Sequence, residues 1–160
     1  MARPRRLAAF GYLGYFAYSL TFCTIRRQRL FAEKPAVALV LGQILRTAGE
    51  RQFELLAYCF MPDHLHLLVQ GVAEDAHLPS FARLVRQRTA VDFRRRFGAA
   101  LWQPGYCEHA LRRCEDMLAT AQYIANNPVR AGLAPTPAAW PFTGGKLLPR
   151  AVLETFPAPK

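Results

Sequence analysis

The chain has 160 residues, 52% of them hydrophobic, which is enough for one domain with a buried core. Lysine and arginine outnumber aspartate and glutamate by 21 to 11, giving a formal net charge of +10 at pH 7. Nearly all of the positive charge is arginine, whose planar fork suits phosphate contacts. This balance favours a polyanionic partner, most simply nucleic acid.

Cysteine usage excludes two small-domain classes. The four cysteines show no C-x-x-C pair, which argues against a zinc knuckle, and a chain of this size does not need a disulfide scaffold. We therefore expect free thiols in a reducing cytoplasm, and a cytoplasmic protein.

The stretch from Leu7 to Ile25 has no charged residue and is flanked by arginines, which is the outline of a signal anchor or a short transmembrane helix. From Phe16 onward, however, larger apolar residues alternate with smaller ones, as in a strand with one buried face. We therefore expect a strand here and no membrane partner.

The predicted elements follow in chain order. We expect a basic N-terminal arm over residues 1–14 and a Pro-rich C-terminal tail with little regular structure over residues 135–160. Between them, hydrophobic periodicity and turn residues predict a strand at Tyr15–Thr24, a helix from Pro35 that Gly49 stops, strands at Phe53–Phe60 and His64–Gln70, a helix at Pro79–Phe97, a short strand at Cys107–Arg112 and a helix at Glu115–Asn126. This βαββαβα order predicts an α+β sandwich of one antiparallel sheet with helices packed on it.

Two histidines in the third predicted strand are candidate metal ligands. Alternation places His64 and His66 on one face of the strand and Leu65 and Leu67 on the other. Two imidazoles side by side on a rigid strand form a ready pair of ligands. The alternative is a surface strand that happens to carry two histidines.

The last predicted helix carries a tyrosine off its core face. Tyr123 lies roughly 140° from the centre of the apolar stripe, and Asn127, four residues on, shares its side of the helix. Asn127 precedes Pro128, so we expect it at the helix end. If this side faces the histidines, the site holds two imidazoles, a carboxamide and a phenol; alternatively, Tyr123 only caps the sheet edge. An N,N,O set suits Mg²⁺ or Mn²⁺ less obviously than zinc.

Three motifs occur together in order: His64-Leu65-His66 within Met61–Leu68, the run from Trp102 to Tyr106, and the run from Tyr123 to Leu133. This combination closely resembles the REP-associated tyrosine transposases, members of the single-tyrosine HUH class of DNA-strand transferases. The resemblance covers about Tyr15 to Thr143.

The resemblance implies a ferredoxin-like catalytic domain, here residues 15–134, that nicks and rejoins single-stranded hairpin DNA with a divalent metal, Mg²⁺ or Mn²⁺. It implies that Tyr123 is the nucleophile of a 5′-phosphotyrosine intermediate. It also implies that His64 and His66 are metal ligands and that Asn127 is the third.

The family also places DNA contacts on basic surface outside the site, and related proteins act as monomers or homodimers. Our candidates for these contacts are Arg26, Arg27, Arg29, Arg83, Arg86, Arg112 and Arg130, with base stacking by Trp102 or Tyr106.

Two other functions compete with this one. An RRM-like binding module would hold hairpin DNA or RNA without cutting it and would need no divalent ion. A metallohydrolase would use His64 and His66 with a bound water as nucleophile and would form no covalent adduct.

Overall fold

The computed structural model describes residues 11–156, which form one five-stranded antiparallel sheet with strand order β4-β1-β3-β2-β5. The elements in chain order are β1 (Ala17–Cys23), the 3-10 helix η1 (Ile25–Arg27), α1 (Lys34–Glu50), β2 (Phe53–Met61), β3 (His64–Gly71), α2 (Leu78–Phe97), β4 (Cys107–Leu111), α3 (Cys114–Arg130), the 3-10 helix η2 (Pro137–Ala139), β5 (Thr143–Gly144) and α4 (Arg150–Leu153).

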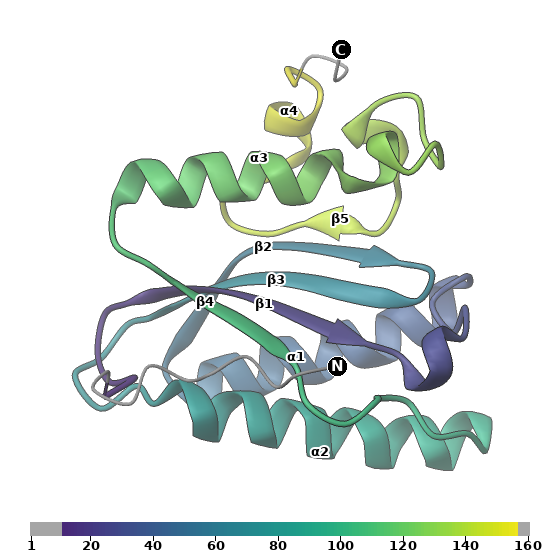
Figure 1. Cartoon of the computed structure of the whole chain (residues 1–160), viewed down its shortest axis with the longest axis horizontal. Helices are drawn as coiled ribbons and strands as arrows, with labels where there is room; N and C mark the ends of the chain where they lie inside the picture. Colours follow the sequence, from purple (N-terminus) through teal and green to yellow (C-terminus); the bar gives the residue numbers. More distant parts are fainter. Residues whose placement is uncertain (1–10, 157–160) are drawn as a thin grey trace.

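The sheet lies between two layers of helices: α1 and α2 cover one face and α3 covers the other (Figure 1). The larger core cluster lies on the α1 and α2 side, where β3 contributes Leu65 and Leu67. A smaller cluster joins Leu68 of β3 to Ile124 of α3. The α+β, ferredoxin-like fold expected from the sequence is therefore confirmed.

The uncharged N-terminal stretch forms a strand over its described part. Tyr18, Leu20 and Phe22 of β1 are buried on the α1 and α2 side, as their alternation predicts. Among residues 11–156, no helix is long and apolar enough to cross a membrane.

Two helices run past the ends expected for them. Gly49 does not stop α1, which continues to Glu50, and the chain then reverses at Gln52, whose φ is 60°. A glycine inside a helix costs only about 1 kcal/mol, which packing overrides.

The helix α3 was expected to end before Pro128 but continues through it to Arg130. Proline lacks the N–H that would bond the carbonyl of Ile124, and the side chain of Asn127 replaces it: its Nδ2 donates to the oxygens of Ile124 and Tyr123, each at 3.3 Å. Asn127 therefore lies within the helix rather than at its end.

The C-terminal tail has more regular structure than its prolines suggested. β5 pairs with the outer edge of β2, and the Trp140 indole N–H donates to the oxygen of Phe60 at 2.9 Å. Leu148 and Leu153 are buried in the cluster beneath α3. The boundary proposed at residue 134 stays a prediction, although residues 135–156 pack on the same sheet.

The predicted N-terminal arm falls mostly outside the described residues, which begin at Gly11. From there the chain is bound to the loop before α2: the oxygen of Tyr12 accepts from the N–H of Leu78 at 3.1 Å, and Leu13 bridges to His77.

Candidate active site

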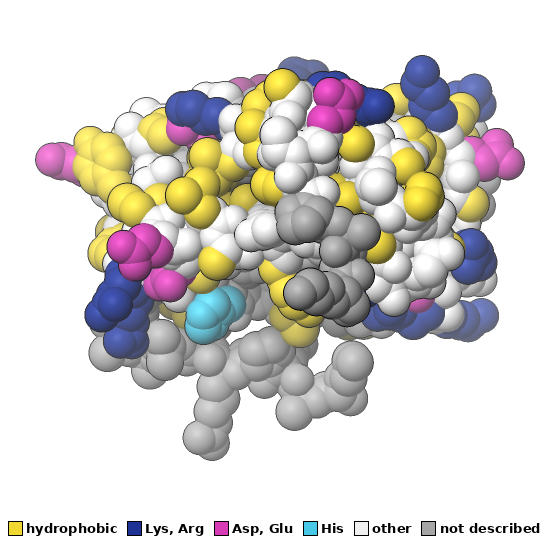
Figure 2. Space-filling model, turned by 90° about the horizontal axis from the view of Figure 1, so that it is seen from above, with side chains coloured by type: hydrophobic (Ala, Val, Ile, Leu, Met, Phe, Trp, Pro, Cys, Tyr) yellow, Lys and Arg dark blue, Asp and Glu magenta, His cyan; other side chains and the backbone are white. Residues whose placement is uncertain are grey.

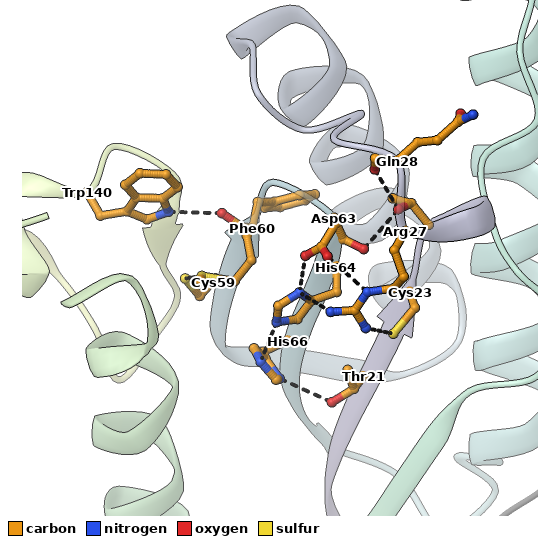
Figure 3. Close-up of polar contacts among 12 residues, drawn as sticks. Thr21, Cys23, Arg27, Gln28, Cys59, Phe60, Asp63, His64, His66 and Trp140 are labelled. Carbon is orange, nitrogen blue, oxygen red and sulfur yellow. Dashed lines mark hydrogen bonds and ion pairs between the residues drawn. The ribbon is translucent and has the colours of Figure 1, made fainter. Parts of the chain in front are cut away.

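The two histidines lie on the central strand, on the face of the sheet that carries α3. In the register of the sheet, His66 pairs with Thr21 on β1, and His64 pairs with Cys23. The imidazoles meet edge to face, with their Nε2 atoms 3.1 Å apart (Figure 3). The sequence-based prediction that these side chains share one face is confirmed.

Each imidazole is oriented by a partner on its other nitrogen. His64 Nδ1 lies 2.6 Å from the carboxylate of Asp63, and His66 Nδ1 lies 3.1 Å from the hydroxyl of Thr21. A carboxylate only accepts, so His64 Nδ1 is the donor in this contact, and the neutral form of the ring then carries its lone pair on Nε2. Metal-binding histidines are typically held in this way.

His66 stays neutral at physiological pH. Burial, with smaller contributions from His64 and from the positive charges of Arg130 and Arg27, lowers its pKa to about 4. A neutral imidazole keeps a lone pair available to a cation.

The spacing of the two Nε2 atoms fits two ligands of one ion. Bonds of about 2.0–2.1 Å from one divalent cation to each nitrogen would span this separation of 3.1 Å. Among residues 11–156, no three or more His, Cys, Asp and Glu side chains gather to hold a metal ion.

A second group of candidate residues lies on α3. The side chain of Tyr123 is 57% exposed, and the guanidinium carbon of Arg130 lies 3.8 Å from the centre of its ring. The same guanidinium donates to Oδ1 of Asn127 at 2.7 Å. The charge of Arg130 also contributes to the lowered pKa of His66.

A groove of about 1170 Å³ extends from Tyr123 along α3 and β4. Its described lining includes Asp116 and Thr120 of α3 and His109 of β4, with Arg112 at the turn between these elements and Phe16 before β1. The groove gives an extended chain an approach to the phenol.

The sequence matches the family model described as "Transposase IS200 like" over residues 14–127, a range that contains His64, His66, Tyr123 and Asn127. The chain belongs to the IS200-like transposase family.

Two relatives found by sequence comparison support this family assignment. The chain is 30% identical over 101 residues to a REP-associated tyrosine transposase of Escherichia coli K12, covering 62% of this chain and 59% of the relative. It is 31% identical over 109 residues to the ISDra2 transposase TnpA of Deinococcus radiodurans, covering 61% and 74%. The matched part thus spans less than two thirds of the first of these relatives.

A solved structure supports the same assignment. The fold matches that of a REP-associated tyrosine transposase bound to a REP hairpin, with a TM-score of 0.73 and 26% identity, covering 89% of this chain and 82% of the other. The resemblance inferred from the three motifs is thereby confirmed.

The residues that we expected to contact DNA lie in different parts of the structure. Arg26, Arg27 and Arg29 are exposed in the loop after β1, and Arg112 lines the groove. Arg83 and Arg86 belong to α2, on the face of the sheet opposite the histidines. The face seen from above mixes basic, acidic and apolar side chains (Figure 2).

Three residues proposed for DNA contact are turned toward the core. Arg86 lies over the rings of Phe22 and Tyr106, at 5.8 and 5.7 Å, and Trp102 packs edge-on against Phe22. The indole N–H of Trp102 donates to the hydroxyl of Thr89 at 2.9 Å. These contacts make Arg86, Trp102 and Tyr106 structural in this state, and their base contacts stay predictions.

Sequence reasoning missed the residues that orient the histidines. Thr21 is 45 positions from His66, so only the pairing of β1 with β3 shows that they meet. Asp63 directly precedes His64, in the turn between the two predicted strands. A carboxylate beside a candidate ligand was the available signal.

Proposed function

We propose that the chain is a metal-dependent, single-tyrosine DNA endonuclease and strand transferase that acts on single-stranded DNA bearing hairpins. His64, His66 and Asn127 would hold Mg²⁺ or Mn²⁺, and Tyr123 would be the nucleophile. The observation that carries the proposal is the convergence of two Nε2 atoms, each on a ring held at Nδ1.

The proposed reaction exchanges one phosphodiester for another. The Tyr123 oxygen loses its proton and attacks phosphorus; the bond from phosphorus to the 3′ oxygen breaks, and that oxygen leaves as a hydroxyl after taking up a proton. The DNA 5′ phosphate is then joined to Tyr123. Attack by a 3′ hydroxyl reverses the step, so rejoining needs no ATP. A bound divalent cation would stabilise the charge that develops on the phosphate.

The proposed role of Asn127 concerns its carboxamide oxygen. Oδ1 accepts one hydrogen bond from Arg130 and has a second lone pair that a cation would take. Arg130 would also contact a phosphate while remaining beside Tyr123.

The proposed substrate follows from the relatives. The structurally similar REP-associated transposase is bound to a REP hairpin, and the excess of arginine in this chain suits a phosphate backbone. Cleavage next to a hairpin would place the single strand in the groove that ends at Tyr123.

A denaturing gel tests the proposal. Single-stranded hairpin DNA from the repeats of the host genome, labelled at its 3′ end, is incubated with the protein and Mn²⁺. We expect a label that migrates with the protein and disappears with EDTA or in Tyr123→Phe. A nick without a linked label would mean a water nucleophile, and tight binding with neither would mean a binding module.

A further inference from the structure

The turn after β1 holds two successive residues in a strained conformation. Arg26 has φ 51° and Arg27 has φ 54°, in the left-handed region that side chains other than glycine avoid at a cost of about 1–2 kcal/mol each. Strain of this kind persists where surrounding contacts determine it and is a reason to look for function.

The strained turn directs the Arg27 side chain onto the carboxylate that orients His64. Its Nε donates to Oδ2 of Asp63 at 2.9 Å, while Oδ1 of the same carboxylate contacts Nδ1 of His64 (Figure 3). Nη1 of the same guanidinium donates to Sγ of Cys23, the last residue of β1, at 2.9 Å, and Nη2 lies 3.5 Å from Nδ1 of His64. Each carboxylate oxygen therefore has one partner, and the group cannot rotate without breaking both contacts.

The main chain of Asp63 is held by the same turn. The N–H and the hydroxyl of Thr24, which is fully buried, donate to the oxygen of Asp63 at 3.0 and 2.9 Å. Its single hydroxyl proton is shared with the oxygen of Gln28, 2.7 Å from Oγ1, so the hydroxyl lies between the two ends of the turn. The turn and the β2–β3 hairpin thus form one unit at this end of the sheet.

The ion pair between Arg27 and Asp63 contributes little to the free energy of unfolding. The side chain of Arg27 is 49% exposed, and ion pairs with such exposure contribute about 0–1 kcal/mol. Its effect is directional: a fixed carboxylate keeps the proton of His64 on Nδ1 and its lone pair toward His66.

We propose that Arg27, acting through Asp63, is a positioning residue that fixes the tautomer and aim of His64 for the metal. This inference rests on the proposed function, which assigns His64 to the metal. The sequence-based expectation that Arg26, Arg27 and Arg29 contact DNA stays a prediction beside this role.

Two glycine variants separate positioning from folding. Arg27→Gly relieves the left-handed strain and removes the guanidinium, whereas Arg26→Gly relieves similar strain and leaves the guanidinium of Arg27 in place. We expect both to unfold at the same or a higher temperature than the wild type. Only Arg27→Gly should weaken Mn²⁺ binding, measured by calorimetry without DNA, by roughly 10–100-fold. Arg27→Lys, which restores a cation without the planar fork, should recover part of the loss.

The protonation of the imidazole is the second readout. Long-range ¹H–¹⁵N spectra of the metal-free protein should show His64 protonated at Nδ1 in the wild type and in Arg26→Gly, and a mixture of tautomers in Arg27→Gly. Wild-type Mn²⁺ affinity together with a single His64 tautomer in Arg27→Gly would overturn the inference. If the wild type itself binds no Mn²⁺, the proposed metal site fails, and the tautomers alone decide the role of Arg27.

Discussion

The proposed metal site depends on the imidazoles of His64 and His66. His66 is neutral and hydrogen-bonded at Nδ1, so its replacement by alanine leaves no charge buried without a partner. We expect His64→Ala and His66→Ala each to abolish hairpin cleavage while keeping the folded structure, measured by denaturing gel and by circular dichroism. Cleavage at the wild-type rate in either variant would remove the metal-site hypothesis.

The sequence predicted the residues of this pair but not what holds them. Alternation along a strand is local, so the shared face of His64 and His66 could be predicted without a structure. The contacts from Thr21 and Arg27 come from β1 and the turn after it, and they depend on sheet register and on a left-handed backbone. The residue types of Thr21 and Arg27 indicate neither the register of the sheet nor a left-handed backbone.

At the scale of elements, the strand β3 has opposite requirements on its two faces. Leu65 and Leu67 are fully buried against α1 and α2, while the alternating residues His64 and His66 lie on the face that carries α3. We expect Leu65→Ala and Leu67→Ala each to lower the free energy of unfolding by about 2–5 kcal/mol, measured by urea denaturation. Gln70→Ala, at a half-buried position of the same strand, is the control and should change it by less than about 0.5 kcal/mol. Equal effects of all three would contradict the assigned facing.

The C-terminal end of α3 could not be predicted from the sequence. Pro128 predicts a helix end because it lacks a donor, yet an asparagine one position earlier supplies a donor from its side chain. The extension to Arg130 matters for the site, since it brings a guanidinium back over the ring of Tyr123.

At the scale of the whole molecule, the C-terminal segment is part of the fold because it packs closely against β2. Gly145 has φ 122°, and a Cβ there would lie 2.6 Å from the Cα of Ala57 and from the oxygen of Leu56. We expect Gly145→Ala to displace this segment and to lower the free energy of unfolding by about 2 kcal/mol or more.

A matched glycine provides the control for this prediction. Gly42 lies inside α1 with open space around it, so Gly42→Ala should raise the free energy of unfolding by about 0.5–1 kcal/mol. Urea denaturation of both variants gives the comparison. A neutral Gly145→Ala would show that residues 140–148 are not held against β2.

The net charge of +10 leads to a prediction about binding by the whole chain. Contacts to DNA phosphates release counterions, so affinity for a hairpin should fall steeply with salt. About six contacts imply a loss of roughly a thousandfold between 50 and 200 mM salt, measured by fluorescence anisotropy with EDTA present. An affinity independent of salt would contradict binding through the arginine-rich surface.

We propose that Tyr123 becomes covalently joined to DNA, and peptide mapping by mass spectrometry after reaction with hairpin DNA and Mn²⁺ would detect that bond. The account predicts a nucleotide adduct on the peptide that contains Tyr123, formed with the wild type and absent from Tyr123→Phe. Tyr123→Phe keeps the aromatic ring beneath Arg130, so it should still fold and bind the hairpin. Cleavage by Tyr123→Phe at the wild-type rate, or an adduct on another residue, would contradict the account.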